Sequence, residues 1–85
     1  MNRLWKEGTI GIPVSGTKEV KIAHFWAKVY DEGSEYGINE GRISKLTVKI
    51  DGVTVINYDR GWDVKPDEDD EVAQIALAIL LNDYN

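Results

Sequence analysis

The segment that most constrains this fold runs from residue 66 to residue 81. Pro66 is followed by five consecutive carboxylates at residues 67–71, and then by a run of alanine, leucine and isoleucine. Proline near a first helical turn, and acidic side chains at the positive end of a helix dipole, are typical of a helix start. The segment therefore predicts a helix over residues 67–84, whose apolar side must be covered by another part of the chain.

The preceding residues predict strands at 5–14, 19–30, 44–50 and 53–59. In the second segment Ala23, Phe25, Ala27 and Val29 fall on one side, because side chains alternate across a strand. Asp51-Gly52 predicts a two-residue hairpin turn between the third and fourth segments. If side chains alternate without interruption through both strands joined by this turn, they divide into a core side and an outer side. The core side holds Leu46, Val48, Ile50, Val53 and Val55, and the outer side holds Lys45, Thr47, Lys49, Thr54, Ile56 and Tyr58.

These elements predict one α+β domain over residues 1–85. It is a four-stranded antiparallel β-meander with one C-terminal helix packed on one face, in the order ββββα. The helix residues expected to pack on the sheet are Val72, Ile75, Ala76, Ile79, Leu80 and Tyr84.

Composition narrows the classes of function. The chain has 85 residues, no cysteine and a net charge of −5. The lack of cysteine excludes a disulfide framework and a cysteine zinc site, and it fits a cytoplasmic protein. The longest apolar stretch, residues 75–81, is too short to span a membrane. The negative charge disfavours nucleic-acid binding by bulk electrostatics, although it leaves a local basic face possible.

No catalytic or metal centre can be assembled from the sequence. His24 is the single histidine and lies in the middle of a predicted strand. The acidic patch (Asp67, Glu68, Asp69, Asp70 and Glu71) lacks the glycine and the alternating ligands of a calcium loop, so we interpret it as a helix start. We therefore predict a protein that is not an enzyme, with no catalytic residue, metal or cofactor.

The longest predicted connection, residues 31–41, is the first candidate binding element. Gly33, Gly37 and Gly41 recur every fourth residue, with Tyr36 and Ile38 between them as candidate anchors. A connection of this length is often a binding loop, and the alternative is a loop that packs on its own sheet.

Residues 59–63 form the second candidate. Arginine and tryptophan side by side, here Arg60 and Trp62, are typical interface anchors. The structural alternative is a local ion-pair cluster, with Trp62 closing one end of the core.

The outer sheet face is the third candidate. Aromatic and basic residues would share it, as in sheets that bind single-stranded nucleic acid. They are Trp26, Lys28, Lys45, Lys49 and Tyr58. The alternative is that the lysine stems cover apolar sheet surface.

Four segments resemble a family of small uncharacterised proteins encoded in phages and integrative elements of Firmicutes and related gut bacteria. The segments are residues 27–30, 33–38, 41–46 and 57–63, which include Gly-Ser-Glu-Tyr-Gly-Ile and Asn-Tyr-Asp-Arg-Gly-Trp-Asp. The resemblance covers residue 25 to the end of the chain. It implies a mobile-element setting, and it brings no established activity and no assigned site residues.

We therefore expect a protein-binding accessory factor of a phage or mobile element, with a host or phage protein as partner. It would make contact through Tyr36, Ile38, Arg60 and Trp62. The first alternative is an acidic nucleic-acid mimic that inhibits a host defence system through residues 67–71. The second is a single-stranded nucleic-acid binder that uses the outer sheet face. No membrane partner is expected, and the sequence leaves the oligomeric state open.

Overall fold

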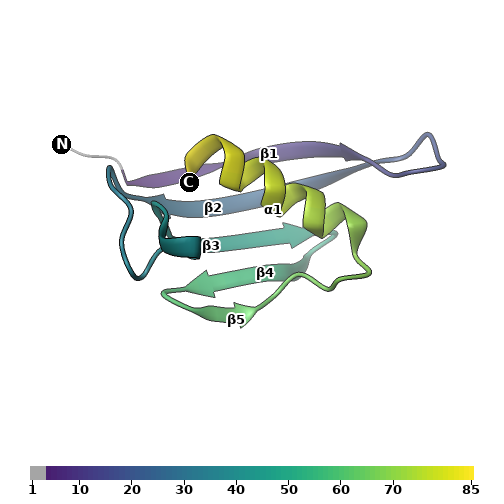
Figure 1. The fold of residues 1–85 in the computed structure, drawn as a ribbon. Coiled ribbons are helices and arrows are strands. Elements are labelled where there is room, and N and C mark those ends of the chain that lie inside the picture. Colours follow the sequence, from purple (N-terminus) through teal and green to yellow (C-terminus); the bar gives the residue numbers. More distant parts are fainter. Residues whose placement is uncertain (1–3) are drawn as a thin grey trace.

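A computed structural model describes residues 4–85 and has two layers (Figure 1). Five antiparallel strands form one sheet in the order β1-β2-β3-β4-β5, and the helix α1 lies across one face. The strands are β1 (Trp5–Pro13), β2 (Val20–Val29), β3 (Ile43–Ile50), β4 (Val53–Asp59) and β5 (Trp62–Val64). A short 3-10 turn, η1 (Ile38–Glu40), lies between β2 and β3, and α1 is Glu71–Tyr84. The predicted α+β meander with one covering helix is confirmed, and the sheet has one strand more than expected.

The alternation predicted for β2 is confirmed. Its core-side residues Ala23, Phe25, Ala27 and Val29 are at most 8% exposed and belong to the cluster of buried apolar residues beneath α1. Lys28 and Trp26, on the other side, are only partly covered. No described element lies over that second face, so the sheet has one buried side and one bare side.

The predicted faces of Ile56 and Tyr58 in β4 are wrong because of a β-bulge. Val48 pairs with Ile56, whereas the next residue of β3, Lys49, pairs with Thr54, so Val55 is an extra residue in β4. An inserted residue reverses the alternation beyond it. Ile56 and Tyr58 therefore join the core, at 0% and 6% exposed. Val55 packs against the core while partly exposed, as expected, whereas Val53 pairs with Ile50 at the start of β4 and is 60% exposed.

The fifth strand was not predicted. The chain was expected to leave the sheet after residue 59, but it turns at Asp59, Arg60 and Gly61 and pairs again with β4. The Arg60 N–H donates to the Ser44 carbonyl at 3.0 Å, which attaches this turn to the start of β3. A strand of three residues is too short to show any alternation in sequence.

The helix begins at Glu71, four residues after the predicted start. A turn occupies the residues in between, because the Asp70 N–H donates to the Asp67 carbonyl and the Asp69 N–H to the Asp67 carboxylate. The Asp70 carboxylate then accepts a hydrogen bond from the Ala73 N–H at 3.0 Å and caps the helix. The interpretation of residues 67–71 as a helix start is thus confirmed for Asp70, while Asp67–Asp69 precede the helix.

Most of the helix residues predicted to face the sheet do so. Val72, Ala76 and Leu80 are buried, and Ile75 and Tyr84 pack against the core while partly exposed. Ala73, which is not among the residues predicted to face the sheet, is also fully buried. Ile79 remains partly exposed.

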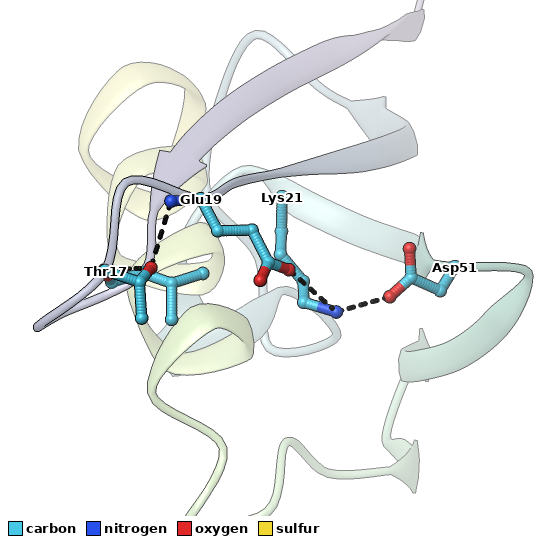
Figure 2. Close-up of polar contacts among 5 residues, drawn as sticks. Thr17, Glu19, Lys21 and Asp51 are labelled. Carbon is cyan, nitrogen blue, oxygen red and sulfur yellow. Dashed lines mark hydrogen bonds and ion pairs between the residues drawn. The ribbon is translucent and has the colours of Figure 1, made fainter.

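Figure 2 shows a polar contact between the start of β2 and the β3–β4 turn. Lys21 extends to Asp51 in the β3–β4 turn, with 2.6 Å between the ammonium and the carboxylate, and lies 3.7 Å from Glu19. Hydrogen bonding and charge from Asp51 raise the pKa of Lys21, and Glu19 adds to this. Thr17 closes the β1–β2 turn by donating to the Val14 carbonyl and accepting from the Glu19 N–H.

Asp70→Ala tests the helix cap. Removing the carboxylate leaves the Ala73 N–H without its partner, so the free energy of unfolding should fall by about 1 kcal/mol. Asp70→Asn keeps a capping oxygen and should stay within about 0.5 kcal/mol of the unmodified protein. Urea unfolding followed by circular dichroism measures both, and equal losses for the two variants would contradict the cap.

Candidate binding groove

The connection between β2 and β3 is fastened to the rest of the molecule by two side chains. The Tyr58 hydroxyl donates to the Tyr36 carbonyl at 2.8 Å. Asn85, after the last turn of α1, donates from Nδ2 to the Ile38 carbonyl and accepts from the Ile43 N–H, each at 3.0 Å. Because β4 and the helix end both hold this connection, it is a packed loop with a defined conformation.

Ile38 is wrong as a contact residue. Its side chain is 2% exposed and belongs to the core cluster, where it anchors the loop from inside. The two interpretations of the loop therefore apply to different residues: Ile38 packs on the protein's own sheet, while Tyr36 is 51% exposed.

The glycine spacing follows from how tightly the loop is folded. A Cβ atom at Gly37 would overlap the Gly41 carbonyl oxygen, and one at Gly41 would overlap the Asn85 side chain. Only glycine allows such close approaches of backbone to backbone and of backbone to side chain. The repeated glycine is thus required by the fold, and it keeps the Tyr36 carbonyl within reach of Tyr58.

Tyr36 forms an exposed pair with Arg60. The Arg60 guanidinium carbon lies 5.4 Å from the centre of the Tyr36 ring, within cation–π distance. Arg60 has a φ of 58°, in the left-handed region that disfavours residues with a Cβ atom. The turn before β5 therefore holds an arginine in a conformation that glycine adopts more readily.

A groove of about 740 Å³ adjoins this pair. It is lined by the residue before β1, by the end of β2 and the loop that follows, by the start of β3 and by the β4–β5 turn. The lining residues are Leu4, Lys28, Tyr30, Asp31, Glu32, Gly33, Ser34, Tyr36, Ser44, Lys45 and Arg60. Its volume falls in the usual range of ligand sites.

The groove unites residues from separate sequence hypotheses. Lys28 and Lys45, which pair across β2 and β3, came from the predicted nucleic-acid face. Tyr36 and Arg60 came from the predicted partner-binding residues, and all four line the groove. Sequence reasoning missed Tyr30 and Ser44, because each looked like an ordinary residue at a strand end.

Tyr30 has the most altered electrostatics in the groove. Hydrogen bonding from the Lys28 side chain lowers the pKa of Tyr30, and the Ser44 hydroxyl and the Arg60 charge lower it further, against an opposing effect of desolvation. The Lys28 ammonium lies 5.4 Å from the centre of the Tyr30 ring. The charges of Lys28 and Arg60 and the Ser44 hydroxyl therefore favour the negative form of Tyr30.

The remaining predicted residues lie outside the groove. Tyr58 is wrong as an outer-face residue, because the bulge in β4 turns it into the core. Trp26 stacks on His24 with ring centres 4.5 Å apart, and Lys49 is exposed on the same outer face. Trp62 packs edge-on against Tyr58 at 5.0 Å, on the core side of the sheet, so it supports the residue that fastens the loop.

Two negative findings apply to residues 4–85. No group of three histidine, cysteine, aspartate or glutamate side chains is placed to hold a metal ion. Within the same range, no helix is long and apolar enough to cross a membrane.

Comparison with known families gives a match over nearly the whole chain. The model of a domain of unknown function, DUF7678, matches residues 4–85. This chain belongs to the DUF7678 family. The match includes every residue of the groove. Neither the comparison with curated proteins nor the comparison with solved structures produced a match.

Asn85→Ala tests whether the helix end holds the loop. The substitution leaves the Ile43 N–H and the Ile38 carbonyl without their side-chain partner in a partly buried place, so the free energy of unfolding should fall by about 1–3 kcal/mol. Asn82→Ala, on the exposed part of the same helix, is the control and should change it by less than about 0.5 kcal/mol. Urea unfolding measures both, and equal effects would show that Asn85 does not fasten the loop.

A spectrophotometric titration tests the electrostatics of the groove. Subtracting the phenolate absorbance of Tyr30→Phe from that of the unmodified protein gives the ionisation curve of Tyr30. The midpoint of this curve should lie below the ordinary tyrosine pKa of about 10. Lys28→Gln removes the largest cause and should raise the midpoint. Lys49→Gln, outside the groove, should leave the Tyr30 midpoint unchanged. If Lys49→Gln shifts the midpoint as much as Lys28→Gln does, the lowered pKa of Tyr30 does not arise from its neighbours in the groove.

Proposed function

We propose that this chain is a non-enzymatic, cytoplasmic protein-binding factor of a phage or other mobile element. Its contact surface is formed by Tyr36, Arg60 and the groove beside them. The partner is a host or phage protein.

The exposed Tyr36–Arg60 pair carries the proposal. Tyrosine and arginine are among the residues that most often dominate the binding energy of protein interfaces. Here the backbone of Tyr36 is held by a hydrogen bond from the buried Tyr58, while its ring remains half exposed. A side chain already fixed in place loses less conformational entropy on binding than one on a mobile loop.

The mobile-element setting rests on the resemblance of residues 27–30, 33–38, 41–46 and 57–63 to proteins encoded in phages and integrative elements. Small acidic α+β proteins from phages commonly act by binding another protein. The absence of cysteine from the sequence supports a reducing compartment, the cytoplasm.

The acidic-mimic alternative has less support, because several of its carboxylates have local structural tasks. Asp70 caps the helix and Asp67 closes the preceding turn. The Glu71 carboxylate accepts a hydrogen bond from Ser15. Mimicry of a nucleic acid requires a broad array of unengaged negative charge, and residues 67–71 offer little of it.

The single-stranded nucleic-acid alternative also has less support. Tyr58 is buried, one face of Trp26 is covered by His24, and Lys45 lies 3.8 Å from the Asp59 carboxylate. The residues proposed to stack bases or to contact phosphates are therefore partly engaged within the protein.

Affinity capture from a Firmicutes lysate, read by mass spectrometry, tests the proposal. The protein should retain a stoichiometric partner after nuclease treatment, and Tyr36→Ala should reduce the captured amount about tenfold or more. The control is the double variant Asp69→Asn, Asp70→Asn, which keeps a capping oxygen and should capture the partner as the unmodified protein does.

Two results would contradict the proposal. Loss of all capture after nuclease treatment would shift the function to the outer sheet face. Loss in the Asp69→Asn, Asp70→Asn variant, together with competition by DNA, would support the acidic mimic.

A further inference from the structure

We propose that the groove binds one carboxylate, the side chain of an aspartate or glutamate in the partner protein, between Tyr30, Ser44, Lys45 and Arg60. This inference rests on the proposed protein-binding function and specifies the chemistry of the partner segment.

The groove supplies the donors that a carboxylate needs. The Tyr30 and Ser44 hydroxyls are hydrogen-bond donors, while Lys28, Lys45 and Arg60 bring three positive charges from three different strands and turns. Ser44 is 5% exposed, so it is a largely covered part of the lining. Hydrogen bonds from charged donors to a carboxylate are about twice as strong as neutral ones.

The charges of the lining favour a monoanion. Three basic side chains and two acidic ones, Asp31 and Glu32, line the groove, and Asp59 outside the lining lies 3.8 Å from Lys45. The positive surplus at the groove is therefore at most one charge, and a single carboxylate is the largest negative charge that it can balance. A phosphate dianion or a nucleic-acid strand would place further negative charge near Asp31 and Glu32, and like charges at close range repel. The same two acids would favour a basic residue beside the bound aspartate or glutamate.

The backbone of Arg60 is a second, independent observation. Its φ of 58° disfavours any residue with a Cβ atom, and the Arg60 N–H already bonds to the Ser44 carbonyl. Glycine would adopt the backbone conformation of this turn more easily, so the conformation does not explain why residue 60 is arginine. Residues with a strained backbone often carry side chains that take part in function. Here the guanidinium is placed over Tyr36 and against the groove.

NMR titration of the ¹⁵N-labelled full chain tests this proposal with four probes. The first is a blocked tripeptide of glycine, glutamate and lysine, and the second replaces glutamate with glutamine. The third replaces it with phosphoserine, and the fourth is oligothymidine. The glutamate tripeptide should cause saturable shifts at Ser34, Ser44, Lys45 and Arg60, and it should bind about tenfold more tightly than the glutamine tripeptide.

Arg60→Gly gives a test that does not depend on loss of the fold, because glycine suits the left-handed backbone at this position. Its thermal midpoint should match that of the unmodified protein within a few degrees, while the affinity for the glutamate tripeptide should fall about tenfold. Lys49→Gln removes an exposed cation from the same sheet face outside the groove and should leave that affinity unchanged.

Any one of four results would overturn the inference. The glutamine tripeptide could bind as tightly as the glutamate tripeptide, or the phosphoserine tripeptide or oligothymidine could bind more tightly than it. The glutamate tripeptide could cause no saturable shifts, or Arg60→Gly could leave its affinity unchanged. If Tyr36→Ala abolishes partner capture while the tripeptides do not bind, the carboxylate site fails and the protein-binding function stands. If the glutamate tripeptide binds as expected but the lysate yields no protein partner, the proposed function fails.

Discussion

The packing of α1 on a single face of the sheet is the constraint on which the rest of the structure depends. A chain of 85 residues has enough apolar side chains for one core, and this chain places them between β1–β4 and the helix. Val72, Ala76 and Leu80 bring the helix close to the alternating apolar residues of β2 and β3. No element of residues 4–85 covers the opposite sheet face, and Lys28 and Lys45 from that face help to line the groove.

The core also positions the groove, through side chains that reach out of it. Tyr58 is buried by the bulge in β4, yet its hydroxyl extends to the Tyr36 carbonyl. Asn85 connects the end of α1 to the loop at Ile38 and Ile43. Folding of the core and ordering of the groove are therefore coupled, and a change in the packing of β4 or of the helix end would be transmitted to Tyr36.

Much of the fold could be predicted from local patterns, and much of the site could not. The alternation in β2, the turn at Asp51-Gly52 and the Ala/Leu-rich helix are all local signals, and each identified its element. The faces of Ile56 and Tyr58 were predicted wrongly, because one extra residue in β4 shifts the register and nothing in the local sequence marks it. Among the candidate site residues, Tyr36, Arg60, Lys28 and Lys45 were singled out, but as members of unrelated hypotheses. Tyr30 and Ser44 were missed because their importance comes from their neighbours in space.

The sequence by itself determined the first four strands and the helix, since these follow from periodicity, turn residues and helix-start chemistry acting over a few residues. Only the tertiary structure decided which side chains meet. Lys28, Ser44 and Arg60 come from β2, β3 and the β4–β5 turn, and strand register brings them to one place. Register depends on bulges and on contacts between residues distant in sequence, and for that reason the groove exists only in the folded chain.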